Sequence, residues 1–213
     1  MPEVADILEV EAPQSKKVPA AAKHSLPIEQ RTDVTVDELE RTSLEYPAEL
    51  YNGKIVFYFP DFEHGLLQGR IAANLDHYLE KNFLGHAMIG TTYRLWPNRP
   101  DQARRPDISF IRSDRMPKDL WRFPIGAPDL AVEIISPEDK FMHIMAKVDA
   151  YLEQGTQIVW VVISDTREVL VCTAAGKHSV KDVLTAPELL PGFELPVGKI
   201  FEGLPLPDKS LSE

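Results

Sequence analysis

Cysteine is almost absent from this sequence, and long apolar runs are absent altogether. The one cysteine, Cys172, lies in the apolar run VLVCT, which excludes an internal disulfide and a zinc site built from a cysteine cluster. No apolar run reaches the roughly 18 residues that a membrane-spanning helix needs. The acidic opening MPEVADILEVEA also lacks the basic and apolar regions of a secretory signal. We therefore expect a cytoplasmic protein with no membrane partner.

A basic excess is lacking too, since 23 Lys and Arg stand against 33 Asp and Glu, for a net charge of −10. A nucleic-acid partner usually needs a basic face that releases counterions from phosphates. The charge is uneven, however. Residues 94–147 hold ten basic and eight acidic residues, a charge of +2, which leaves −12 for the remainder. That strip would suit a phosphate-rich substrate, but charged side chains often only solvate a surface. Composition alone therefore leaves the partner open.

The length of 213 residues, with 44% hydrophobic residues, predicts one main hydrophobic core. Residues 1–33 show no sustained periodicity and contain Pro13, Pro19 and Pro27, so we expect a flexible N-terminal arm. Residues 34–213 then form a single domain. Its proline-rich end, TAPELLPGFELPVGKIFEGLPLP (185–207), predicts an irregular tail that wraps the outside.

The first half of this domain alternates helix and strand signals. A short helix is predicted in 34–45, because Thr35 and Glu38 have the spacing of a capping box. The pair Asn52-Gly53 between apolar segments is typical of a tight hairpin turn. Apolar residues at helical spacing predict an amphipathic helix over 64–82, and strands are expected at 88–96 and 107–111.

The second half predicts a parallel crossover. The run DLAVEII (129–135) is apolar enough for a strand buried on both faces. Ser136 is placed to cap a helix whose apolar stripe extends to Leu152, and Gly155 supplies a left-handed stop. The runs IVWVVI and VLVCT then read as further strands. The whole pattern predicts an α/β fold with a central mixed sheet flanked by helices.

Glu133 is the most informative residue, because it interrupts the apolar run LAVEIIS. A buried carboxylate costs several kcal/mol unless a cation or strong donors compensate it, so either a buried salt bridge or a metal is expected. Asp107 opens a predicted strand 26 positions earlier, and neighbouring strands could bring the two acids together. Two close carboxylates repel unless they share a proton or bind a cation. Hard oxygen ligands favour Mg²⁺ or Mn²⁺ over zinc.

Lys147 lies on the helix that follows Glu133, between His143 and Tyr151 at i,i+4 spacing. This polar stripe could face the metal. An ammonium group there could orient the attacking water or stabilise charge on a phosphate. An ordinary surface lysine is the alternative that the spacing leaves open.

Several segments in this order resemble the Uma family of restriction endonucleases within the PD-(D/E)xK nuclease superfamily. The segments are ELYNG (49–53), His64-Gly65, RRPDISFI (104–111), PDLAVEIISPED (128–139), Lys147 and YLEQGTQIVWVVIS (151–164). The resemblance covers about 34–196. It implies a restriction-endonuclease-like core in which Asp107 and Glu133 match the metal-binding acids, with Glu49 as a further acid.

The sequence departs from the superfamily pattern at two positions. The E-x-K pattern would place a lysine at 135, where this chain has Ile135. Lys147, supplied by the following helix, matches the lysine of the family's S-P…K…Y…G pattern instead. His143 stands where relatives often carry an aspartate. Both departures bear on catalysis rather than on the fold.

The resemblance implies a metal-dependent endonuclease that hydrolyses phosphodiester bonds, with DNA as the substrate and Mg²⁺ or Mn²⁺ as the cofactor. Lys147 would position the water, and Arg104 and Arg105 would engage flanking phosphates, although loop arginines can also be purely structural. His64 would contact substrate or serve as a structural histidine. Cutting both strands of a duplex would suit a homodimer. Two alternatives remain open: a binding or regulatory module on the same fold, and a phosphohydrolase acting on small nucleotides.

Overall fold

A mixed six-stranded sheet forms the centre of the computed structural model, which describes residues 26–135 and 141–205. The spatial order is β3-β4-β5-β6-β7-β8. The strands are β3 (Gly85–Ile89), β4 (Ile108–Arg112), β5 (Leu130–Ile135), β6 (Ile158–Ile163), β7 (Glu168–Thr173) and β8 (Gly176–Val180). Strands β5 and β6 pair in parallel, and the other neighbours pair antiparallel. The predicted central mixed sheet is therefore confirmed.

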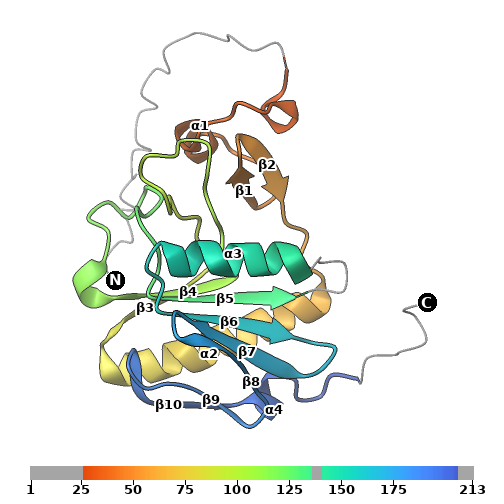
Figure 1. Cartoon of the computed structure of the whole chain (residues 1–213), viewed down its shortest axis with the longest axis vertical. Coiled ribbons are helices and arrows are strands. Elements are labelled where there is room, and N and C mark those ends of the chain that lie inside the picture. Colours follow the sequence, from red (N-terminus) through yellow and green to blue (C-terminus); the bar gives the residue numbers. More distant parts are fainter. Residues whose placement is uncertain (1–25, 136–140, 206–213) are drawn as a thin grey trace, which may run out of the picture.

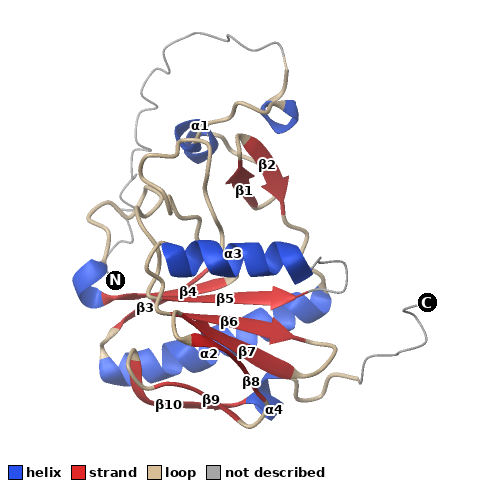
Figure 2. Ribbon diagram, in the orientation of Figure 1, coloured by secondary structure: helices blue, strands red, loops and turns tan. Residues whose placement is uncertain are grey.

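Two long helices cover the two faces of the sheet (Figures 1 and 2). Helix α2 (Phe62–Asn82) buries Leu67, Ile71 and Leu75 against a core that includes Trp160 of β6. Helix α3 (Phe141–Glu153) packs on the opposite face, in a second cluster with Ala131 and Val159 of the sheet. Both helices use the apolar stripe that their periodicity predicts.

The unit β5-α3-β6 is the parallel crossover that the sequence predicts. Leu130, Ala131 and Val132 have no exposed surface, as a strand covered on both faces requires. Gly155 follows α3 with φ +98°, in the left-handed region that favours glycine. The predicted helix start at Ser136 lies outside the described residues.

A small N-terminal unit stands beyond α3 in Figure 1 and contributes one wall of the site described below. It comprises a 3-10 helix (Ile28–Gln30), α1 (Val36–Arg41) and the hairpin of β1 (Ala48–Tyr51) and β2 (Lys54–Phe57). The predicted cap of α1 is present, with the Thr35 side chain accepting from the backbone of Glu38. The hairpin turns at Asn52-Gly53, where both φ angles are positive.

The boundary predicted for the N-terminal arm falls inside this unit. Residues 26–33 contain the 3-10 helix, and the Arg31 guanidinium bonds the Glu38 carboxylate at 3.0 Å. This stretch therefore packs onto α1. The rest of the predicted arm, residues 1–25, lies outside the described residues.

The interpretation of residues 185–207 as irregular chain is wrong for most of their described part. Strands β9 (Val183–Ala186) and β10 (Leu190–Pro196) form an antiparallel pair, followed by α4 (Val197–Ile200). Prolines are tolerated in β10 because this sheet has only two strands, so half of the backbone donors have no ladder partner. The register also shifts between Leu190 and Leu195. Leu190, Phe193 and Leu195 are buried in the core that α2 shares.

The strand predicted at 88–96 corresponds to β3 (Gly85–Ile89), which is shorter than predicted and begins earlier in the chain. Strand β3 ends at Ile89, because Gly90 turns the backbone with φ +55°. Tyr93 and Leu95 then pack into the cluster beneath α3. No helix within residues 26–135 and 141–205 is long and apolar enough to cross a membrane.

Candidate active site

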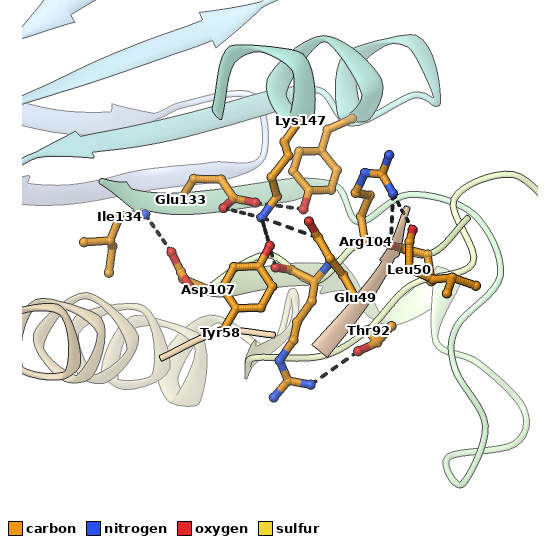
Figure 3. Close-up of polar contacts among 12 residues, drawn as sticks. Glu49, Leu50, Tyr58, Thr92, Arg104, Asp107, Glu133, Ile134 and Lys147 are labelled. Atoms are coloured by element: carbon orange, nitrogen blue, oxygen red, sulfur yellow. Dashed lines mark hydrogen bonds and ion pairs between the residues drawn. The ribbon is translucent and has the colours of Figure 1, made fainter. Parts of the chain in front are cut away.

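One pocket of about 450 Å³ gathers most of the predicted site residues. It lies where the β1-β2 hairpin, the start of α2, the segment before β4, the end of β5 and α3 meet (Figure 3). The predicted residues that line it are Glu49, His64, Arg105, Asp107, Glu133 and Lys147.

Glu133 is 2% exposed and projects from β5 toward α3. Its Oε2 accepts a hydrogen bond from Lys147 Nζ at 2.7 Å, and its Oε1 accepts one from the Tyr151 hydroxyl at 2.8 Å. Burial raises the pKa of Glu133, Lys147 opposes that rise, and the nearby charge of Asp107 adds to it. The salt bridge considered for this acid is therefore present, and its partner is the helix lysine.

Lys147 is 8% exposed, so it is not a surface lysine. Its Nζ also donates to the Tyr58 hydroxyl at 2.7 Å and lies 3.6 Å from Glu49 Oε2. Burial favours the neutral amine, but the carboxylates of Glu133 and then Glu49 raise the pKa of Lys147 well above its usual value. The group is therefore an ammonium ion, and it contacts β1, β5 and the residue that follows β2.

Asp107 lies immediately before β4 and is fixed by two neighbours. Its Oδ2 accepts from the backbone N–H of Ile134, at 2.7 Å, which ties it to the strand position next to Glu133. Its Oδ1 lies 3.1 Å from His64 Nε2, near the start of α2. Buried His64 thus holds the carboxylate of Asp107, while its predicted contact with substrate stays a prediction.

Arg105 also lines the pocket. Its guanidinium donates to Thr92 Oγ1 at 3.3 Å, and burial lowers the pKa of Arg105. The side chain lies against Gly90, where a Cβ atom would meet a guanidinium nitrogen at 2.6 Å. The backbone N–H of Arg105 donates to Glu49 Oε2 at 3.2 Å, so this acid links the hairpin to the pocket.

Arg104 does not line the pocket. The residue is 4% exposed, and its guanidinium donates to the backbone carbonyls of Leu50 and Ala103 at 2.7 and 3.1 Å. It also lies over the rings of Tyr51 and Trp96. These contacts fasten β1 to the chain before β4. The predicted phosphate contact of Arg104 thus has no support from its position.

Sequence reasoning missed Tyr58, which lies just after β2 in the run FYF. Its hydroxyl accepts from Lys147, and the Lys147 ammonium lies 4.9 Å from its ring centroid. No spacing in the sequence marks this residue, because the contact joins positions 89 apart. Tyr151, recognised only as part of the helix stripe, is the second tyrosine that holds the Lys147–Glu133 pair.

Residues 36–198 match the model of the Uma2 family, which is described as "Putative restriction endonuclease". This chain belongs to the Uma2 family. Among solved structures, it resembles a "putative nuclease belonging to DUF820" from Anabaena variabilis, with a TM-score of 0.68 and 22% identity over 79% of this chain and 97% of the other. At that identity the likeness concerns the fold. The predicted family and α/β fold are confirmed, while a search of curated proteins found no match.

The donor set of this Uma2 pocket fits a hard divalent cation. Three carboxylates line it (Glu49, Asp107 and Glu133) against the cations of Arg105 and Lys147. Each carboxylate has about four lone-pair sites, and Asp107 and Glu133 each have two contacts in the bonds described above. The described residues contain no group of three or more His, Cys, Asp or Glu arranged to hold a metal. Two carboxylates completed by water are the usual protein ligands of Mg²⁺.

Proposed function

We propose that this chain is a metal-dependent endonuclease that hydrolyses phosphodiester bonds of nucleic acid, with DNA as the expected substrate. The observation that carries the proposal is the 2.7 Å contact between Lys147 Nζ and Glu133 Oε2 beside Asp107. The E-x-K pattern would place a lysine at position 135, two residues after Glu133. Here Lys147 of α3 contacts Glu133 instead. The pocket thus brings the acids Asp107 and Glu133 together with a lysine, a set that can serve metal-dependent phosphodiester hydrolysis.

Asp107 and Glu133 would hold Mg²⁺ or Mn²⁺. The bound ion would lower the pKa of a water molecule and offset charge on the scissile phosphate. The carboxylate of Asp107 is kept in place by the backbone of β5 and by His64. These contacts hold the ligand in place before substrate arrives, which reduces the reorganisation needed during the reaction.

The cationic side chains act on the water and the phosphate. Lys147 has three N–H donors, and Glu133 and Tyr58 accept two of them at 2.7 Å. The third makes only a long contact of 3.4 Å with the Arg105 carbonyl, so it is the donor that can turn to the attacking water. Arg105 has five N–H donors, and the bond to Thr92 uses one of them. The rest can bind the non-bridging oxygens of the phosphate. Arg105 is the phosphate-binding residue of this proposal.

The test is cleavage of supercoiled and single-stranded DNA at low salt with Mg²⁺ or Mn²⁺. Asp107→Ala and Glu133→Ala should abolish metal-dependent cleavage, and Arg105→Ala should weaken substrate binding. Asp114→Ala is the matched control, because this exposed acid lies outside the pocket. Wild-type protein that neither cleaves DNA nor binds metal in calorimetry would contradict the proposal.

One observation favours a second candidate, a binding or regulatory module on the same fold. Both oxygens of Glu133 accept hydrogen bonds, one from Lys147 and one from Tyr151. A module of this kind would take up little metal, and loss of its buried acid could stabilise it. A small-nucleotide phosphohydrolase would instead cleave dinucleotides as well as polymers, so substrate length separates it from an endonuclease.

The proposed activity also bears on assembly. A single pocket cuts one strand, so cleavage of both strands of duplex DNA would be natural for a two-fold homodimer. Sedimentation velocity of the full chain, with and without DNA, tests this expectation.

A further inference from the structure

Three aromatic side chains form a group at the surface that we term the aromatic rim: Tyr46 and Phe59, which are exposed, and Phe57, which is half-buried. The ring centroids of Tyr46 and Phe59 lie 5.0 Å apart, and that of Phe57 lies 6.4 and 6.3 Å from them. Phe59 is 70% exposed and Tyr46 is 44% exposed. Exposed aromatic rings that are grouped in this way commonly mark a binding surface.

The aromatic rim is continuous with the candidate active site. Phe57 and Phe59 line the same pocket as Asp107 and Glu133. Tyr58, between them in the chain, bonds the ammonium of Lys147. A molecule held at the catalytic carboxylates therefore lies beside these rings.

The charge around the rim does not suit the phosphates of a duplex. The segment 45–63, which carries all three rings, contains four acids (Glu45, Glu49, Asp61 and Glu63) and one lysine, for a charge of −3. Duplex binding depends on basic groups that track two phosphate backbones. In the pocket the cations are Arg105 and Lys147, enough for a single phosphate. The rim offers apolar ring faces, which suit bases.

We infer that the substrate has an unpaired nucleotide next to the scissile phosphate, and that its base stacks on the aromatic rim. The substrate class is then single-stranded or locally unpaired nucleic acid. This inference rests on the proposed function and narrows it. Bases paired inside a duplex keep their faces stacked on one another, so only an unpaired base can offer a face to Phe59.

A second copy of this chain is the competing occupant of the rim. Phe57 and Phe59 belong to the pocket wall itself, so a copy seated on them would cover the mouth of the pocket. A nucleic-acid strand can occupy the rim and the carboxylates together. The position of the rings therefore favours substrate.

The experiment measures binding by fluorescence anisotropy, in Ca²⁺ so that cleavage does not interfere. The probes are a labelled single strand of about 12 nucleotides, a duplex of the same length, and an abasic strand that keeps the phosphates but has no bases. Wild-type protein should bind the single strand more tightly than both other probes. Equal binding of the single and abasic strands would overturn the inference.

Variants then locate the contact. Phe59→Ala should weaken single-strand binding about tenfold, the effect of losing one stacked base, and leave abasic binding unchanged. Phe59→Leu keeps an apolar group without the ring, so it should be nearly as weak. Phe62→Ala is the matched control, because Phe62 is 86% exposed and does not line the pocket. Unchanged binding by Phe59→Ala would contradict the stacking role.

The outcomes separate this inference from the proposed function. Suppose that metal-dependent cleavage is lost in Glu133→Ala but is unaffected by Phe59→Ala on every substrate. The proposed nuclease activity is then supported, and base stacking on the aromatic rim is overturned. If the protein binds single strands in a base-dependent way but cleaves no substrate, base stacking on the aromatic rim is supported and the proposed nuclease activity is contradicted. A Phe59→Ala variant that changes sedimentation but not DNA binding assigns the rim to an interface between copies and overturns the inference.

Discussion

Replacing Lys147 by Met tests the central ion pair of the pocket. The change removes the cation nearest to Glu133 and keeps a side chain of similar length. Glu133 would retain the Tyr151 hydroxyl but would lie, buried, beside the charge of Asp107. Removal of one partner from a buried ion pair typically costs about 3–5 kcal/mol.

Proton uptake by Glu133 limits this loss. The ordinary pKa of the group is 4.5, so keeping it protonated in the folded state at pH 7 costs about 2.5 × 1.36, or about 3.4 kcal/mol. We therefore expect Lys147→Met to lower the free energy of unfolding by up to about 3 kcal/mol at pH 7, less the part of this cost that the raised pKa of Glu133 already imposes on wild type.

The sign of the pH dependence follows from the direction of the pKa shift. Burial raises the pKa of Glu133, and loss of Lys147 raises it further, so the folded state binds more protons than the unfolded state above pH 4.5. Stability then falls as pH rises. Both proteins lose stability at the same rate until pH reaches the raised pKa of wild-type Glu133. Above that pH the gap between wild type and Lys147→Met should widen by up to about 1.4 kcal/mol per pH unit.

Urea unfolding followed by tryptophan fluorescence measures both effects, since Trp160 is fully buried in the core. Lys177→Met is the matched control. Lys177 is an exposed lysine paired with Asp149 at 3.0 Å, and its loss should cost at most about 1 kcal/mol. Saturating Mg²⁺ should stabilise Lys147→Met more than wild type, because a bound cation replaces the lost charge. A pH-independent loss as small as that of the control would refute the reasoning.

Three further variants test other parts of the structure. Tyr58→Phe keeps the ring but removes one hydrogen-bond partner of the Lys147 ammonium, so steady-state DNA cleavage should show kcat about tenfold lower, or about 1.4 kcal/mol. Urea unfolding should show a loss of about 1–3 kcal/mol for the buried donor left unpaired; a change in KM alone would contradict a positioning role. Thr35→Ala removes the cap of α1 and should cost about 1 kcal/mol in urea unfolding without loss of cleavage. Phe193→Ala should cost about 3–5 kcal/mol, because this buried ring stacks on Trp160. If Phe193→Ala lowered the free energy of unfolding by less than about 0.5 kcal/mol, the hairpin of β9 and β10 would not be packed in the core but would lie on the surface as a tail.

Local patterns in the sequence determined most of the elements. The run DLAVEII could be read as a strand buried on both faces, because its apolar character leaves no solvent-facing side. The pairs Asn52-Gly53 and Thr35/Glu38 fixed a turn and a helix start through chemistry that involves only neighbouring residues. Glu133 stood out as a candidate site residue because it lies in that apolar run, where burying its charge is costly.

The proline-rich end of the chain could not be read in the same way. Its prolines exclude a central strand but not a two-stranded hairpin, and only packing against α2 and Trp160 decides between hairpin and irregular chain. The neighbours Arg104 and Arg105 have the same local sequence context. The fold places one guanidinium behind β1 and the other in the pocket.

The sequence by itself therefore indicated the family, the order of the helices and strands as far as β7, and Asp107 and Glu133 as candidate site residues. Only the tertiary structure decided that Lys147 contacts Glu133, and that Tyr58 joins it across the pocket. The physical reason is the range of the interactions. Periodicity and turn chemistry act over a few residues, whereas the contacts of Lys147 join elements that are brought together by burial of the apolar faces of the sheet, helices and hairpin.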